Sequence, residues 1–190
     1  MNNLNFLDIK NNRECNKKVI KLYNEAFPKE ERIPIWLLKK LARKSKAHFY
    51  GIYDNEKFIG LIYNIYYKDI VFIFYLAIDK ETRGKGYGSK ILEFIKQTYT
   101  KHRIILCIEQ MNKSSNNYKQ RKKRKEFYIK NGFKDANYSV KEKGVVYDIL
   151  ETYIKFIIWK DWWTWENYLH QRVSQKDTQT SYVIIYQIVF

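Results

Sequence analysis

A glycine-rich segment headed by an arginine separates an apolar strand from an amphipathic helix in the middle of this chain. Residues 72–95 read FIFYLAIDKETRGKGYGSKILEFI. The free backbone N–H groups of a helix N-terminus, and the positive end of its dipole, favour an anion at such a junction. Side chains at Gly86 or Gly88 would stand between those N–H groups and phosphate oxygens. The segment therefore predicts a phosphate-binding loop.

The spacing of the glycines excludes two common phosphate loops. A P-loop requires G-x-x-x-x-G-K-[ST], and a dinucleotide-binding turn requires G-x-G-x-x-G within a parallel βαβ series. Here Gly84, Gly86 and Gly88 alternate with other residues, Ser89 stands where a third dinucleotide-motif glycine is expected, and no βαβ series surrounds them.

The segment instead resembles the acyl-coenzyme A loop of the GNAT superfamily of N-acetyltransferases, whose pattern after a strand is [RQ]-x-x-G-x-[GA]. Arg83, Gly86 and Gly88 match that pattern. The preceding Leu-Ala-Ile-Asp of residues 76–79 resembles the usual approach to the loop. Lys80 replaces the common proline there, which affects the turn more than the chemistry.

A second motif lies about forty residues further on. Residues 126–133 read EFYIKNGF and resemble the family segment [LF]-Y-x-K-x-G-F, in which Tyr128, Gly132 and Phe133 are the matching positions. Two motifs at the family's separation are harder to obtain by chance than either alone. Together they extend the resemblance over residues 70–135.

The resemblance implies acetyl-CoA as co-substrate and assigns residues to it. Backbone groups of the strand end pair with the pantetheine and polarise the thioester carbonyl, amides of the loop bind the pyrophosphate, and two basic side chains add charge. Asn117 resembles a polar residue that often contacts the cofactor. Many members carry an asparagine seven residues before the tyrosine, where this chain has Arg121. The implied cofactor-binding residues are Leu76, Ala77, Ile78, Arg83, Gly84, Lys85, Gly86, Tyr87, Gly88, Ser89 and Asn117.

Two catalytic residues are expected. Tyr128 is the candidate general acid that protonates the departing thiolate, and the alternative is a tyrosine that only fills the helix–sheet interface. Glu109 is the candidate general base, and the alternative is a solvated strand end; Glu30 and Glu31 are also placed for this role. The acceptor is a small-molecule or peptide primary amine, and the acidic pair at 30–31 favours a cationic one.

Apolar periodicity predicts strands and helices in the order β-α-α-β-β-β-α-β-α-β-β. This order resembles the GNAT fold, which implies an α+β protein with a mixed sheet. By resemblance, the fourth and fifth strands splay apart to admit the pantetheine arm. The expected strands are residues 5–9, 48–53, 57–66, 70–78, 103–108 and a hairpin within 133–150, and the expected helices are residues 17–27, 34–41, 87–100 and 118–131.

Residues 1–150 are predicted to form the GNAT domain, followed by a tryptophan-rich extension at 151–190. The favoured interpretation packs this extension on the same domain, because clustered tryptophans are rarely left exposed. A homodimer surface and a poorly ordered terminus altered by a reading-frame change are the alternatives.

The net charge is +16, and the densest basic run is KQRKKRK at residues 119–125. We interpret it as a solvated helix face, with RNA binding by a catalytically inactive, acyl-CoA-sensing module as the alternative function. The N-terminus lacks the pattern of a signal peptide, and no apolar stretch approaches the length of about 18 residues that a membrane span needs. Two cysteines suit a reducing compartment, and Cys107 is expected to be buried. A cytoplasmic enzyme without a metal is predicted, because the three histidines show no metal-ligand spacing.

Overall fold

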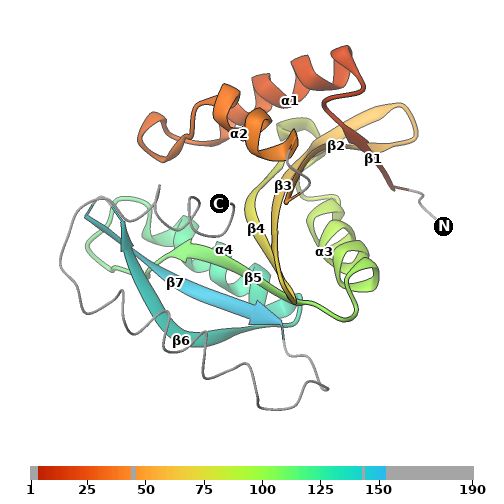
Figure 1. Cartoon of the computed structure of the whole chain (residues 1–190). Coiled ribbons are helices and arrows are strands. Elements are labelled where there is room, and N and C mark those ends of the chain that lie inside the picture. The colour runs from red at the N-terminus through yellow and green to blue at the C-terminus, as the bar shows by residue number, and fades with distance from the viewer. Residues whose placement is uncertain (1–3, 44–45, 143, 153–190) are drawn as a thin grey trace. The chain divides into compact units, whose positions relative to one another are not determined.

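The computed structural model describes residues 4–43, 46–142 and 144–152. The chain divides after Thr100 into two compact units. The first unit holds the predicted phosphate loop, and the second holds the second sequence motif (Figure 1). The tryptophan-rich extension lies outside the described residues, apart from its first two positions.

Four antiparallel strands form the sheet of the first unit, in the order in which they occur in the chain. Tight turns join the last three, with Asn55 and Lys68 at positive φ. Asparagine adopts this conformation more readily than most residues, so the turn at 54–56 was foreseeable. The strands are β1 (Leu4–Asp8), β2 (Ala47–Asp54), β3 (Lys57–Tyr67) and β4 (Ile70–Ile78).

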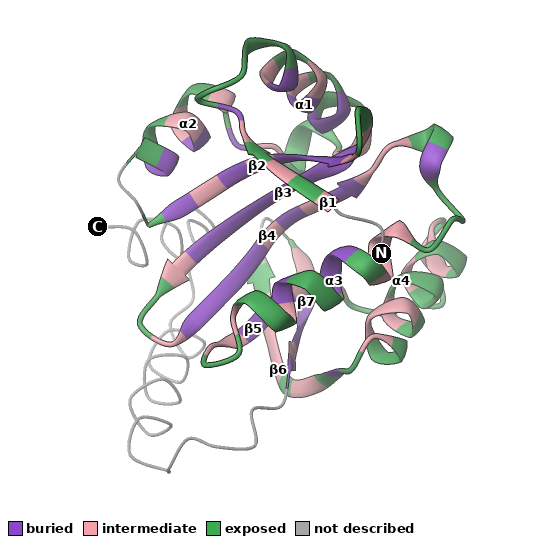
Figure 2. Ribbon diagram, turned by 90° about the vertical axis from the view of Figure 1, so that its right-hand side faces the viewer, coloured by how far each residue is buried: buried purple, intermediate pink, exposed green. Residues whose placement is uncertain are grey.

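Helices pack on both faces of this sheet. Phe49 of β2 contacts Tyr23 of α1 (Arg13–Ala26), and α2 (Ile35–Arg43) lies on the same face, where Tyr63 donates a hydrogen bond to Leu38. On the opposite face, α3 (Tyr87–Thr98) stacks Phe94 on Phe6 of β1. The strands between are therefore mostly buried, as Figure 2 shows for β2, β3 and β4.

The helix α1 begins four residues before the predicted start. Asn12 accepts a hydrogen bond from the backbone N–H of Cys15 (2.8 Å) and caps the helix there. An asparagine at this position satisfies one of the N–H groups that a helix start leaves without a partner. Pro34 precedes α2 immediately, as predicted from its place in the sequence.

A β-bulge interrupts the pairing of β3 with β4. Asn64 pairs with Ile73, whereas Tyr63 pairs with Tyr75, so that Phe74 is the extra residue. Because side chains alternate along a strand, one extra residue moves all the following side chains to the other face. The bulge therefore decides which side chains of β4 meet α1 and α2.

The second unit is a three-stranded antiparallel sheet with one helix. β7 (Val145–Thr152) lies between β5 (Arg103–Glu109) and β6 (Phe133–Glu142). Gly144, at φ 84°, forms the turn of the β6–β7 hairpin within the predicted turn region. The helix α4 (Tyr118–Lys130) carries the basic run and has no buried residue.

The described residues confirm the predicted α+β class and the predicted order of strands and helices, with two additional short 3₁₀ turns, η1 (Lys29–Glu31) and η2 (Lys80–Thr82). One burial prediction was wrong: Cys107 is partly exposed, because it alternates with buried neighbours along β5, whereas Cys15 is buried under Gly51. Among the described helices, none is both long and apolar enough to cross a membrane.

Candidate functional site

The turn between β4 and the glycine loop is anchored to the sheet. The backbone N–H of Asp79 donates to the carbonyl of Ile59 (2.8 Å), and the buried Thr82 hydroxyl donates to the same carbonyl (3.2 Å). The Asp79 carboxylate also accepts the N–H of Glu81 (3.0 Å). These bonds hold the turn without the proline that the family pattern has at position 80.

The glycine loop has the backbone conformation that an anion site needs. Gly84 and Gly86 lie at φ 76° and 79°, in the left-handed region that disfavours other residues. A Cβ built on either glycine would have no atom within 4 Å. The positive φ angles therefore require glycine at these two positions. A side chain there would not collide with other atoms of the protein, and the space beside the glycines is open.

Gly86 is the N-cap of α3, so the N–H groups of the first turn have no capping side chain from this residue. The residues that follow it are Tyr87, Gly88 and Ser89. An anion beside the open glycines can accept hydrogen bonds from these amides and is stabilised by the helix dipole. The first unit thus brings the predicted pyrophosphate ligands together in one loop.

The side chains of the loop are held away from its backbone. Arg83 donates its Nε–H to the carbonyl of Ile78 (3.0 Å), and Lys85 is exposed. The Tyr87 hydroxyl donates to the Asp54 carboxylate (2.7 Å), a bond that raises the pKa of this phenol. Asp54 was not anticipated, because nothing local in the sequence links the β2–β3 hairpin to the loop.

The predicted thioester-binding segment ends β4. Leu76, Ala77 and Ile78 pair with β3, and Ile78 lies opposite Gly60. A Cβ at Gly60 would stand 2.3 Å from the carbonyl oxygen of Ala77. Gly60 therefore permits the close approach of β3 to the segment, and a glycine inside a strand was the signal that could have revealed it.

In the second unit, Tyr128 lies on α4 with its ring against Phe127 and Phe133, at centroid distances of 5.1 and 5.6 Å. Tyr128 is half-buried, and the removal of water from around its phenol raises the pKa to about 12, although the nearby Arg124 opposes the shift. The phenol therefore keeps its proton at neutral pH, as a general acid must.

The candidate base Glu109 is engaged by two arginines. Its carboxylate lies 2.8 Å from Arg121 Nη2 and 3.4 Å from Arg124 Nη1, and only 12% of its side chain is exposed. Asn117 donates to the same carboxylate (3.3 Å) and accepts a hydrogen bond from Arg121 Nε (2.7 Å). Arg121 thus contacts both Glu109 and Asn117, two of the three predicted site residues of this unit. Its place in the sequence, where many family members have an asparagine, did not suggest this role.

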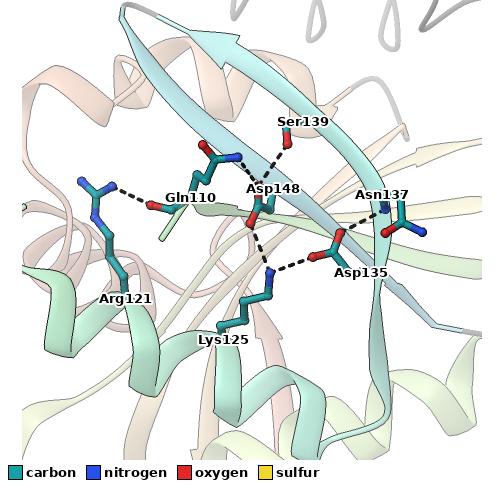
Figure 3. A network of polar contacts seen from close by, with 7 residues as sticks. All are labelled: Gln110, Arg121, Lys125, Asp135, Asn137, Ser139 and Asp148. Atoms are coloured by element: carbon teal, nitrogen blue, oxygen red, sulfur yellow. Dashed lines mark hydrogen bonds and ion pairs between the residues drawn. The ribbon is translucent and has the colours of Figure 1, made fainter. Parts of the chain in front are cut away.

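A second polar network ties α4 to its sheet (Figure 3). Lys125 Nζ lies 2.7 Å from Asp135 of β6 and 3.2 Å from Asp148 of β7. Asp148 also accepts hydrogen bonds from Gln110 and Ser139, both at 3.0 Å. Hydrogen bonding and charge raise the pKa of Lys125 and lower that of Asp135. Lys125 of the basic run therefore binds α4 to its sheet and does not simply face the solvent.

The remaining candidates lie apart from these groups. Glu30 and Glu31 are exposed in η1 of the first unit. His48 shares a hydrogen bond of 2.8 Å with the Tyr50 hydroxyl, and burial lowers its pKa. Among the described residues, no group of three or more His, Cys, Asp or Glu is arranged to hold a metal ion.

The α+β fold of this chain runs a strand into an open glycine loop at a helix N-terminus, a backbone arrangement that can bind a phosphate group. Residues 45–135 match the family model described as the acetyltransferase (GNAT) domain. The matched range includes both motifs, so the resemblance of residues 45–135 to the GNAT acetyltransferase domain is confirmed.

Solved structures agree with this assignment at the level of the fold. A protein from Bacteroides thetaiotaomicron, assigned to the GNAT family of acetyltransferases, is 22% identical with a TM-score of 0.68, and the alignment covers 92% of this chain and 99% of that one. An aminoglycoside 6′-N-acetyltransferase complexed with coenzyme A is 14% identical with a TM-score of 0.63, covering 82% and 99%.

A mutant of a spermidine N-acetyltransferase from Vibrio cholerae is 16% identical with a TM-score of 0.57, covering 78% of this chain and 91% of that one. No curated protein sequence matches the chain.

Proposed function

We propose that this protein is an acetyl-CoA-dependent N-acetyltransferase that moves the acetyl group directly to a primary amine. The observation that carries the proposal is the open loop at the start of α3, where Gly84 and Gly86 keep positive φ beside free space. Its resemblance to the family's loop supports acetyl-CoA as the ligand, with the pyrophosphate on the amides from Gly84 to Ser89.

In the proposed reaction, the neutral amine nitrogen attacks the thioester carbonyl carbon and forms a tetrahedral intermediate. Backbone groups of residues 76–78 hold the thioester and stabilise the negative oxygen. The C–S bond then breaks, and Tyr128 donates its proton to the departing thiolate. The Tyr128 phenol is protonated at neutral pH and therefore has a proton to donate, while its raised pKa, about 12, makes it a weaker acid than an ordinary phenol.

The amine must also lose a proton, and the carboxylates differ in how readily they could take it. Glu109 can act as the base only if its ion pair with Arg121 opens, because the two arginines lie against the carboxylate oxygens that would take the proton. Glu30 and Glu31 are exposed in η1 and are the alternative candidates for the base. Glutamine substitutions at 109, 30 and 31, each followed by a pH–rate profile, identify the base: its loss removes the acidic limb of the profile.

A cationic amine is the proposed acceptor class. The acidic pair in η1 supports it, as does the likeness in fold to enzymes that act on spermidine and aminoglycosides. A screen should release thiol from acetyl-CoA faster with polyamines and aminoglycosides than with neutral amines of similar size. Equal rates would refute this choice of acceptor and leave the enzyme class intact.

The proposal is tested first by calorimetric titration with acetyl-CoA and by thiol release with an amine panel. Micromolar binding with turnover supports the enzyme. Binding without turnover on any amine supports an acyl-CoA sensor, and RNA binding then becomes the question for the exposed Lys119 and Lys123 of α4. Cytoplasmic location remains a prediction that fractionation of the native cell would check.

A further inference from the structure

Two buried tyrosines from different elements meet at one backbone segment of the first unit. The Tyr23 hydroxyl of α1 accepts the N–H of Ile33 (2.9 Å) and donates to the carbonyl of the same residue (3.0 Å). The Tyr75 hydroxyl of β4 accepts the same N–H (3.2 Å) and donates to the carbonyl of Glu31 (2.8 Å). Exposed fractions of 1% and 5% for the two tyrosines put these bonds in the core.

The segment held in this way joins η1 to α2 and contains the acidic pair. Its backbone is irregular at Arg32 and Ile33: the Arg32 N–H closes the η1 turn on the Lys29 carbonyl (3.3 Å), whereas the Ile33 N–H bonds to the two tyrosine hydroxyls. Phe27, just before η1, packs its ring against Tyr75 at 4.7 Å. The position of the segment therefore depends on side chains of the sheet beneath it.

Tyr75 reaches this segment because of the bulge at Phe74. The bulge pairs Tyr75 with Tyr63, whose hydroxyl donates to Leu38 of α2 (3.2 Å). Directly opposed residues in a sheet share a face, so both tyrosines point toward α1 and α2. Without the extra residue, Tyr75 would point toward α3 and could not bind the segment.

The residue after Tyr75 is Leu76, the first of the three thioester-binding positions. The side chain of Tyr75 thus hydrogen-bonds to the segment, and the residues that follow it in β4 carry the backbone groups assigned to the thioester. We propose that Tyr75 is a positioning residue that sets the segment 29–33 relative to the thioester, and thereby sets how the amine acceptor is held. This inference rests on the proposed function and on its assignment of the acceptor to this segment.

The proposal distinguishes Tyr75 from Tyr23. Tyr23 links Ile33 to α1, ten residues earlier in the chain, whereas Tyr75 donates to the Glu31 carbonyl and connects the segment to β4. Loss of the Tyr75 hydroxyl should leave the aromatic packing in place and let the segment shift. Because contacts that hold the amine equally in the ground state and the transition state contribute uniform binding, we expect KM for the amine to rise about tenfold, with kcat changed by less than about twofold.

The test compares Tyr75→Phe with Tyr63→Phe. The control removes a buried hydroxyl from the same face of the sheet, with its own backbone acceptor in α2. Steady-state thiol release would give KM for the amine and kcat, calorimetry would give the Kd of acetyl-CoA, and hydrogen exchange would follow residues 29–34. We expect Tyr75→Phe alone to raise KM for the amine and to speed exchange of this segment, with the Kd of acetyl-CoA unchanged in both variants.

Equal kinetic values for Tyr75→Phe and Tyr63→Phe, in an enzyme whose wild type is active, would overturn this inference alone. A wild type that turns over no amine would instead refute the proposed function. If Tyr75→Phe does not fold, Tyr23→Phe carries the test, because it keeps the bond to Glu31 and should match Tyr63→Phe. A rise of about tenfold in KM in Tyr23→Phe would overturn the special role of Tyr75.

Discussion

Replacement of Gly86 by alanine should separate two reasons for a glycine in the loop, namely its positive φ angle and the space that it leaves for a phosphate group. Gly86 has φ 79° and ψ 0°, a left-handed conformation that costs a residue with a Cβ about 1–2 kcal/mol. No atom lies within 4 Å of the new Cβ, so no collision adds to that cost in the free protein. The melting temperature should therefore fall by only about 2–8 °C, at about 2–4 °C per kcal/mol for a chain of this size.

The effect on acetyl-CoA binding should be much larger than the effect on stability. The added methyl group would occupy the space through which phosphate oxygens approach the first-turn amides of α3. Loss of two charge-assisted hydrogen bonds at about 1.5–3 kcal/mol each predicts that the Kd of acetyl-CoA rises by at least about 100-fold. Calorimetric titration, performed well below the melting temperature of the variant, would measure it.

Gly144 supplies a matched control. It has φ 84° in the β6–β7 turn, and a Cβ built there also meets no atom within 4 Å. Gly144→Ala should therefore lower the melting temperature by a similar amount and leave the Kd of acetyl-CoA unchanged. If Gly86→Ala and Gly144→Ala bound acetyl-CoA equally well, the assignment of the loop to the pyrophosphate would be refuted.

Three further perturbations test other parts of the molecule. Tyr128→Phe should lower kcat about 100-fold or more while the Kd of acetyl-CoA is kept, and unchanged turnover would remove the tyrosine from the mechanism. Gly60→Ala should weaken acetyl-CoA binding by displacing Ala77, since its Cβ would stand 2.3 Å from that carbonyl oxygen; wild-type affinity would contradict this. The ion pair of Lys125 with Asp135 should make stability depend on pH at both ends. The pKa of Asp135 is lowered by folding, so its contribution is present above its unfolded pKa of about 3.9 and is lost as pH falls; the pKa of Lys125 is raised, so its contribution is present below about 10.4 and is lost as pH rises. Chemical denaturation from pH 3 to 11 should show both losses reduced in Asp135→Asn, and identical curves for variant and wild type would show that the pair contributes nothing.

Local signals in the sequence predicted most of the secondary structure. Pro34 marks the start of α2, the asparagine of the 54–56 turn accepts positive φ, and the predicted fourth strand has the observed bounds of β4. The start of α1 was placed too late because the prediction followed apolar spacing and overlooked Asn12 as a cap. Such features depend on a few neighbouring residues, which is why a single sequence can reveal them.

The candidate site was predictable only where its chemistry is local. The loop at 83–89 combines glycines and a helix start within one short segment, so its backbone conformation follows from the sequence. Glu109 looked equally suited to a base or a solvated strand end. Its capture by Arg121 and Arg124, which follow twelve and fifteen residues later, depends on how α4 packs, and no local pattern encodes that.

The sequence by itself determined the strands, the helices and the conformation of the glycine loop of this protein, because backbone propensity, capping and glycine conformation act over a few residues. Tertiary structure alone decided the partners of the polar side chains. A single extra residue at Phe74 turns Tyr75 toward α1 and lets it hold Glu31, 44 residues away in the chain. The register between β3 and β4 sets that direction, and register results from the packing of whole strands.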